Sequence, residues 1–393
     1  MATRTTTTAR TRAAPAPSAD HPDADLTLEQ LAVAYFDCRR TKRNTPSALV
    51  FEKHLERNLI NLFDDLQDGS YQPGQSICFV VTRPTAREVW AADFRDRVVH
   101  HLLYNKISPR FYASFIKDTC ACIPGRGTMY AAKRLESKIR SVTQNWARPA
   151  FYLKCDLANF LVAIDKDVLR EQIAARVSEP WWLRLAETIL FHDPRENYQL
   201  RGAPELLARV PAHKRLVNQP AHLGLPIGNL SSQFFANIYL DALDQHAKHR
   251  IGARHYIRYV DDFLLLHESP QWLGAALDSI NEFLPRVLHA NLNPTKTILQ
   301  PIARGVDFVG QVIKPWHSRT RRRTVHEATS RIAGTPAADV VAAANSYFGL
   351  LRQADSSHAD RAALARAVMR RGHCVNGALT KTYRKSVLNG RTK

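Results

Sequence analysis

Residues 254–267 read Arg-His-Tyr-Ile-Arg-Tyr-Val-Asp-Asp-Phe-Leu-Leu-Leu-His. Apolar and aromatic residues on both sides of two adjacent acids predict a β-hairpin, with strands at 256–259 and 263–266 and the turn at 260–262. The carboxylates of Asp261 and Asp262 would repel each other, and loss of water would raise their pKa values unless cations neutralise them. Hard divalent cations such as Mg²⁺ prefer carboxylate oxygens. The stretch therefore predicts either a metal site on a hairpin or a polar turn whose acids face water.

The charge of the chain indicates its class of partner. Its 393 residues include 55 Lys and Arg against 36 Asp and Glu, a net charge of +19. This excess predicts binding to nucleic acid, because Lys and Arg that contact phosphates release condensed counterions. A membrane partner is not expected, since no amphipathic basic helix is evident and no apolar run approaches the roughly 20 residues that span a bilayer. The six cysteines lack zinc-ligand spacing and no secretory signal is present, so we expect reduced thiols and a cytoplasmic location.

Hydrophobic periodicity divides the chain into helices and strands. Residues 1–25, rich in Thr, Ala, Arg and Pro, predict a disordered tail. After Asp360 the chain has no acidic residue but many Lys and Arg, which favours a nucleic-acid contact over a merely solvated surface. We predict helices near 26–66, 92–103, 165–177, 178–191, 231–249 and 271–288 and again from about 337, and strands at 77–81, 151–157, 297–300 and 306–313.

A third acid, Asp156, closes the apolar strand that begins at Phe151. Alternation along that strand places Tyr152, Lys154 and Asp156 on one face. A strand that ends in Asp beside a hairpin tipped by Asp-Asp would bring carboxylates from separate elements together. Such a set suits two metal ions that clamp the attacking and leaving oxygens of a phosphoryl transfer.

These residues resemble the reverse transcriptases, from about residue 75 to 355. Tyr259-Val260-Asp261-Asp262 is similar to their Tyr-x-Asp-Asp motif, and Asp156 to the aspartate of their first motif. The resemblance implies an α+β right-hand polymerase with fingers, a palm with an antiparallel sheet, and a helical thumb. The N-terminal helices and fingers would occupy 26–150, the palm with further fingers segments 151–315, and a basic helical thumb and C-terminal tail 316–393.

The same resemblance implies a metal set. Asp156, Asp261 and the backbone carbonyl of Leu157 would hold two Mg²⁺ ions, with Mn²⁺ as a substitute. Asp262 would support the site electrostatically. Lys296 resembles the lysine that protonates departing pyrophosphate.

Further segments follow in the family's order. Arg87 resembles the fingers residue that contacts the phosphates of the incoming nucleotide, a task suited to a guanidinium. The run 225–233 is similar to the nucleotide-pocket loop and helix, with Ile227, Gly228 and Gln233 as its candidate contacts, and we expect the glycine to allow close approach to substrate. The segments 93–101 and 125–128 resemble fingers segments on the template side, and 306–310 resembles the primer-grip turn.

Three departures from the usual residues of the family bear on its branch and its substrate. Many reverse transcriptases carry Gln-Gly-x-x-x-Ser-Pro, where this chain has Ile227-Gly228-x-x-x-Ser232-Gln233. This variant resembles the diversity-generating retroelement branch, whose enzymes copy RNA with errors at adenines. Five residues after Asp156 the family usually has an aromatic that blocks the ribose 2′-hydroxyl. In this chain Leu161 stands at that position, directly after Phe160. Discrimination against the ribose 2′-hydroxyl is therefore either relaxed, or unchanged because Leu161 fills the same space. Met129 also departs from the branch, which commonly has His there.

The resemblance implies an RNA-directed DNA polymerase that extends a DNA primer with dNTPs on an RNA template, here a noncoding RNA. A retroelement enzyme would work with a small basic accessory protein. The alternative is an antiphage-defence reverse transcriptase with a defence partner and with untemplated or protein-primed synthesis. A further alternative is a catalytically idle nucleic-acid scaffold, against which the retained Asp156, Asp261 and Lys296 argue.

Overall fold

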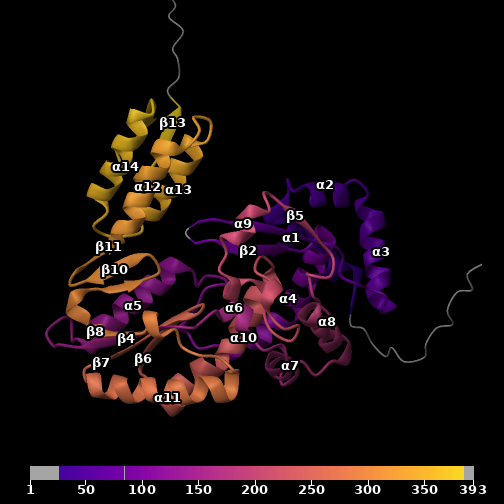
Figure 1. Ribbon diagram of the computed structural model, residues 1–393, viewed down its shortest axis with the longest axis horizontal. Coiled ribbons are helices and arrows are strands. Elements are labelled where there is room, and N and C mark those ends of the chain that lie inside the picture. The colour runs from indigo at the N-terminus through magenta and orange to yellow at the C-terminus, as the bar shows by residue number, and fades with distance from the viewer. Residues whose placement is uncertain (1–25, 84, 385–393) are drawn as a thin grey trace, which may run out of the picture.

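The computed structural model describes residues 26–83 and 85–384, so the tail predicted at 1–25 lies outside the described residues. A central β-sheet lies between a helical N-terminal unit and a helical C-terminal unit (Figure 1). Within the described residues, no helix combines the length and apolar character that crossing a membrane requires. The molecule is a mixed α and β structure, as predicted.

The central sheet has the strand order β3-β6-β7-β4-β8. All neighbours in it are antiparallel except β3 and β6. Leu153 and Cys155 of β4 enter the core that includes helix α11, whereas Tyr152 enters the core on the α5 face. This alternation confirms the predicted faces of the strand. The elements are β3 (Thr119–Cys120), β4 (Phe151–Asp156), β6 (His255–Tyr259), β7 (Asp262–His267), β8 (Ile298–Pro301), α5 (Thr128–Val142) and α11 (Pro270–Leu288).

The N-terminal unit contains the helices predicted at 26–66. Pro46 stands in the first turn of the second of them, where its missing N–H costs nothing. The next helix runs to residue 114, well past the predicted end at 103, and includes Pro109. The helices are α1 (Leu28–Lys42), α2 (Pro46–Glu52), α3 (Leu55–Gln67) and α4 (Phe94–Ser114).

Beside this unit lies a small sheet with the order β2-β1-β5, formed by β1 (Ser76–Val81), β2 (Arg87–Ala91) and β5 (Tyr198–Arg201). The first two strands form an antiparallel hairpin, and β5 pairs parallel to β1. Short helices α9 (Glu205–Ala208), η1 (Ala212–Lys214) and η2 (Leu216–Asn218) follow β5. Leu207 of α9 and Leu216 of η2 pack with Cys78 and Trp90 of the hairpin, so this segment returns to it.

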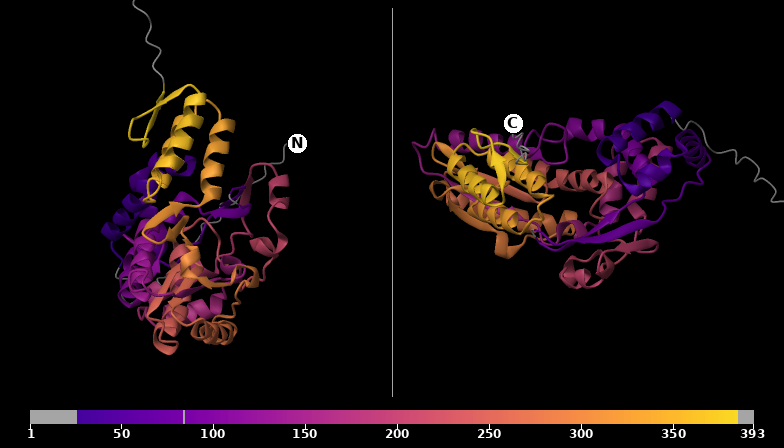
Figure 2. Two further views of the ribbon diagram at one scale, coloured as in Figure 1. Left: turned by 90° about the vertical axis from the view of Figure 1, so that its left-hand side faces the viewer. Right: turned by 90° about the horizontal axis from the view of Figure 1, so that it is seen from above.

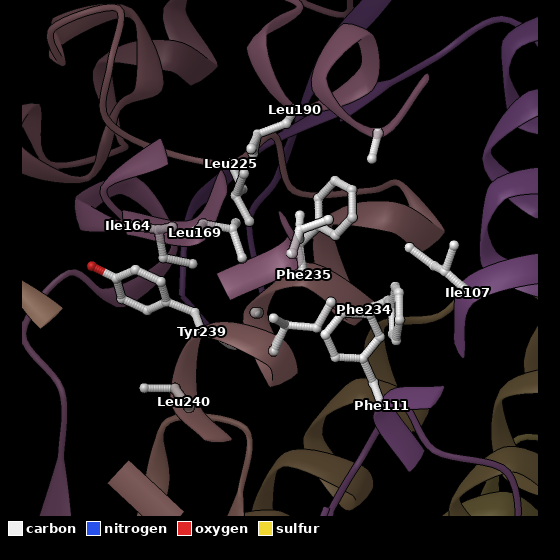
Figure 3. Packing of buried hydrophobic residues seen from close by; sticks show 14 of the residues in the cluster. Ile107, Phe111, Ile164, Leu169, Leu190, Leu225, Phe234, Phe235, Tyr239 and Leu240 are labelled. Carbon is white, nitrogen blue, oxygen red and sulfur yellow. The ribbon is translucent and has the colours of Figure 1, made fainter. Parts of the chain in front are cut away.

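Helix α10 (Leu230–Gln245) is the centre of the largest core. Figure 3 shows Phe234, Phe235 and Tyr239 of this helix among side chains of α4 and of the segment 164–190. A single π-turn, η3 (His246–Arg250), continues α10 to one residue beyond the predicted end at 249. The helices around it are α6 (Phe160–Ala163), α7 (Lys166–Ala174) and α8 (Pro180–Phe191), the last two close to their predicted bounds.

The C-terminal unit stands beyond the central sheet, as Figure 2 shows from two sides. The single strand predicted at 306–313 is wrong: Val309 and Gly310 adopt φ +44 and +87 and form a turn between two strands. Helical structure begins at 322 rather than near 337, because the basic run 319–323 divides between a strand and a helix. The elements are β9 (Val306–Phe308), β10 (Gln311–Lys314), β11 (His317–Thr320), α12 (Arg322–Gly334), α13 (Val340–Leu351), α14 (His358–Arg370), β12 (His373–Val375) and β13 (Thr382–Arg384).

Candidate active site

The acidic hairpin pairs with the strand that ends in the third acid. Asp262 lies opposite Tyr259 within the hairpin and opposite Asp156 on β4. The turn is shorter than predicted: it consists of Val260 and Asp261, and Asp262 already belongs to β7. Val260 has φ +57, a conformation that β-branched residues rarely adopt. Strand pairing therefore brings the three carboxylates together, as the spacing predicted.

A cavity of about 240 Å³ opens beside this hairpin. Most of the predicted site residues line it, from elements far apart in the sequence. Asp262, Gly228 and Gln233 are not among the lining residues. Those that are comprise Arg87, Asp156, Leu157, Phe160, Leu161, Ile227, Asp261 and Lys296.

The two adjacent acids face different partners. Asp261 lines the cavity, whereas Asp262 Oδ2 lies 3.0 Å from Lys154 Nζ. Lys154 Nζ also donates to the Asp307 carbonyl at 2.9 Å, which ties the site to β9. Asp262 Oδ1 is buried and has no hydrogen-bond partner among the described residues.

Burial makes this pair of acids costly to ionise. It raises the pKa of Asp262 to about 6, and burial together with the nearby Asp156 raises the pKa of Asp261. A cation near such carboxylates favours their charged forms and lowers their pKa values again. The site is therefore one that a cation would stabilise.

One such cation belongs to the protein. Lys296 Nζ donates to both oxygens of Asp156, at 2.8 and 3.0 Å. The backbone places the two residues together, because Asn293 N donates to the Asp156 carbonyl at 2.8 Å and Lys296 ends the 3₁₀ turn η4 (Pro294–Lys296) that follows. The ammonium thus neutralises Asp156, and the proton-donor role expected for Lys296 stays a prediction.

The donor set fits a Mg²⁺ ion whose remaining ligands come from water and substrate, rather than an ion that protein side chains alone would coordinate. No group of three or more His, Cys, Asp or Glu side chains within residues 26–83 and 85–384 is arranged to hold a metal. Mg²⁺ typically binds one or two carboxylates, waters and substrate phosphates. Asp156 and Asp261 would supply such carboxylates at the cavity wall, and Leu157 lies beside them.

Comparison with known proteins agrees with this geometry. Residues 85–313 match the family model described as reverse transcriptase (RNA-dependent DNA polymerase). The chain belongs to the reverse transcriptase family.

Among solved structures, two telomerases are similar to this reverse transcriptase. Apo telomerase from Candida tropicalis, truncated from its C-terminal domain, is 12% identical over 63% of this chain and 55% of its own, with a TM-score of 0.45. Telomerase from Candida albicans, in complex with a fragment of telomeric RNA, is 13% identical over 82% of this chain and 58% of its own, with a TM-score of 0.43. The chain thus spans less than two thirds of either telomerase chain. No curated protein matches it.

In this reverse transcriptase the glycine of the pocket loop packs against strand β2. Gly228 has φ +128, and a Cβ there would lie 2.8 Å from Val89 Cγ1 and 3.0 Å from the Trp90 carbonyl oxygen. Trp90 N also donates to the Ile227 carbonyl at 2.7 Å. Strand β2 therefore fixes the backbone of Ile227, which lines the cavity, and the close approach of Gly228 to substrate stays a prediction.

The remaining pocket residues divide into those at the cavity and one away from it. Asn159 adopts φ 51 and starts the short helix α6, which presents both Phe160 and Leu161 to the cavity. Leu225 N donates to the Leu161 carbonyl at 2.8 Å, which fixes this wall against the pocket loop. Gln233 is exposed on α10 and does not line the cavity, so the structure does not bring it to the predicted site.

The structure adds Lys214 to the site. This exposed lysine ends η1, and its segment is anchored to β2, since the buried Glu88 Oε2 accepts from Leu216 N at 3.0 Å and from Trp90 Nε1 at 3.1 Å. The basic run 213–215 was the available signal, but charge runs are usually solvated surface. Asn159 and Asn293 are further cavity residues that sequence reasoning missed.

Proposed function

We propose that this reverse transcriptase extends a DNA primer with dNTPs on an RNA template inside the cavity between Arg87 and Asp261. The supporting observation is the cavity itself, where the carboxylates of Asp156 and Asp261 face the cations Arg87, Lys214 and Lys296. The cations would bind the negatively charged triphosphate. The carboxylates would bind metal ions next to the primer 3′-hydroxyl. Positioning and charge neutralisation would supply most of the acceleration.

Each residue has a task in the proposed reaction. Two Mg²⁺ ions bound at Asp156, Asp261 and the Leu157 carbonyl would lower the charge on the α-phosphate and on the attacking and leaving oxygens. Arg87 would orient the β- and γ-phosphates with its fork of donors. Lys296 would move from Asp156 toward the departing pyrophosphate and give it a proton.

The chain is proposed to follow the domain plan of its family. The N-terminal helices and the fingers, with the β1–β2 hairpin, would occupy 26–150, the palm with further fingers segments 151–315, and the basic helical thumb and C-terminal tail 316–393. A second cavity of about 880 Å³ lies between Arg83 of that hairpin and the basic side chains of α12, which supports this gap as the path of the template–primer duplex. The basic lining residues from α12 are Arg323, His326 and Arg331.

Primer extension tests the function directly. The full chain, an RNA template, a labelled DNA primer, four dNTPs and Mg²⁺ are expected to give a full-length product that disappears with EDTA. A chain that binds the template–primer but gives no product under any divalent ion would instead be the idle scaffold. Sequencing the nucleic acids that copurify with the protein would identify its natural template.

Ile227 supports a low-fidelity enzyme of the diversity-generating retroelement type. Its side chain is a hydrocarbon at the wall of the nucleotide cavity, so it cannot hydrogen-bond to a correctly aligned pair. We expect Ile227→Gln to lower misincorporation opposite template adenine by about tenfold. Sequenced products from one RNA template give the error rates, and Ile227→Leu, which stays apolar, should keep the parent rate. Equal error rates for parent and Ile227→Gln would contradict the proposal.

Leu161 supports weak selection against ribonucleotides. Leu lacks the flat wall of an aromatic ring, and at this position it lines the cavity beside the buried Phe160. Leu161→Phe is expected to lower rNTP relative to dNTP incorporation by about tenfold. Single-nucleotide incorporation with matched rNTP and dNTP measures the ratio, and the volume-conserving Leu161→Met should leave it unchanged. Identical ratios in all three proteins would mean that Phe160 and Leu161 already exclude the 2′-hydroxyl.

Lys214 is expected to bind the triphosphate. Replacement by Ala removes one charge-assisted contact and should raise the KM for dNTP about tenfold with little change in kcat. Lys214→Arg should keep most of the affinity. Steady-state kinetics at varied dNTP measure the effect, with Lys53→Ala, which removes an exposed lysine of the N-terminal unit, as the matched control. An unchanged KM would place Lys214 outside the nucleotide site.

A further inference from the structure

The turn of the acidic hairpin holds a residue in a conformation that its side chain disfavours. Val260 lies at φ +57, in the left-handed region, where a β-branched residue is an outlier. Such a conformation persists only where the surrounding structure holds it. Because Asp261 follows directly, the direction of its carboxylate depends on whatever holds Val260.

A buried guanidinium contacts this residue. Arg258 Nη1 donates to the Val260 carbonyl at 2.9 Å and to Asn237 Oδ1 at 3.2 Å. Arg258 Nε and Nη2 bind the two oxygens of Asp244, each at 2.7 Å. Neither side chain of this ion pair is exposed to solvent. Only protein groups therefore satisfy the guanidinium, and each of them restricts its position.

Asp244 is in turn held by donors from other elements. In addition to Arg258, it accepts from Thr119 Oγ1 of β3 at 2.6 Å and from Tyr256 Oη of β6 at 2.7 Å. A carboxylate offers about four lone-pair sites, and four donors occupy them here. A network satisfied in this way is rigid. Strand β3 and helix α10 thus fix the guanidinium, and the guanidinium fixes the turn.

We propose that Arg258 is the positioning residue of the catalytic turn: its guanidinium holds the Val260 carbonyl so that Asp261 faces the nucleotide cavity. The inference rests on the polymerase function proposed above. A residue that only stabilised the core would change melting temperature alone. A positioning residue, in contrast, becomes dispensable once residue 260 adopts the left-handed conformation without help, as glycine does.

The test uses the full chain with Arg258→Lys, which keeps a positive charge beside Asp244 but loses the planar fork of donors. We expect kcat for primer extension to fall by about 100-fold, with little change in the KM for dNTP, because the carboxylate is misplaced. Adding Val260→Gly should recover about tenfold of that loss. Gln144→Gly is the matched control, since Gln144 also lies at a positive φ, +49, but at an exposed site in the loop between α5 and β4. It should recover nothing.

Hydrogen exchange gives a readout that needs no catalysis. Arg258→Lys should speed amide exchange in the peptide that spans 259–262, whereas exchange in the β9–β10 turn should stay as in the parent. If Arg258→Lys does not fold, Asn237→Ala carries the same comparison, since it leaves the ion pair and removes an acceptor that orients Nη1.

Two results would overturn the proposal: unchanged exchange at 259–262, or a folded Arg258→Lys that Val260→Gly fails to rescue more than Gln144→Gly does. A parent protein that extends no primer would instead overturn the proposed function, and the exchange experiment would still decide the role of Arg258.

Discussion

Asp261→Asn is expected to lower the rate of nucleotide addition by at least about 1,000-fold, which corresponds to about 4 kcal/mol of transition-state stabilisation. The substitution keeps the size of the side chain and removes the negative charge that the proposed metal ions require. Asp261 lines the cavity beside Asp156, so no other carboxylate of the hairpin turn can replace it there. Single-turnover extension at saturating dNTP measures the loss.

Stability distinguishes a functional acid from a structural one. Burial raises the pKa of Asp261 in the folded protein, so its ionised form destabilises the fold as pH rises above the carboxyl's ordinary pKa. In EDTA at pH 7, Asp261→Asn should therefore melt no lower than the parent, and any gain should vanish in acid, where the parent carboxyl is protonated. Asp278→Asn, at an exposed site on α11, is the control and should change neither activity nor melting. Retention of a tenth of the activity by Asp261→Asn would exclude Asp261 as a metal ligand.

Asp244→Ala is expected to have the largest effect on stability, a loss of about 3–5 kcal/mol. It leaves the Arg258 guanidinium charged, buried and without its carboxylate, and it removes the acceptor of Thr119 and Tyr256 as well. Burial opposes the charged guanidinium, and in the parent the adjacent Asp244 carboxylate outweighs this effect and raises the pKa of Arg258. The variant loses that carboxylate but keeps the charge, because a guanidinium does not release its proton in proteins. Urea unfolding followed by circular dichroism gives the free energy.

The control for this prediction is a solvated ion pair. Arg170 Nε lies 2.6 Å from Glu187 Oε1, but their side chains are 52% and 28% exposed. Glu187→Ala should therefore cost less than about 1 kcal/mol. If Asp244→Ala costs no more free energy of unfolding than Glu187→Ala, the buried network contributes little to the stability of the fold.

Local pattern predicted the elements around the site well. The alternation of Tyr152, Leu153 and Cys155 gave the correct faces of β4, because side chains of a strand alternate whatever surrounds it. One error came from packing that overrides local preference, and another came from extending a strand through Gly310 although a glycine favours a turn. Helix α4 continues through Pro109 within a buried interface, and the strand expected at 306–313 turns at Val309.

The candidate site shows the same division. The strand and hairpin pattern predicted that Asp156 and Asp261 meet, and the resemblance to reverse transcriptases implied that Ile227 and Lys296 join them; all four line one cavity. Local pattern alone could not separate the two acids of the hairpin, and only the resemblance gave them different roles. Asp262 points to Lys154 because of its register in the sheet, and Asp261 reaches the cavity because it lies in the turn.

The sequence by itself determined the family, the charge that favours nucleic acid, and the acids at the centre of the site, since these depend on residue identity and short-range periodicity. Only the tertiary structure decided which groups serve those acids. Lys214 reaches the cavity through an anchored loop, Gly228 meets strand β2, and Arg258 holds the turn from inside the core. Such contacts depend on how distant elements pack, and packing is a property of three-dimensional neighbours that no local pattern encodes.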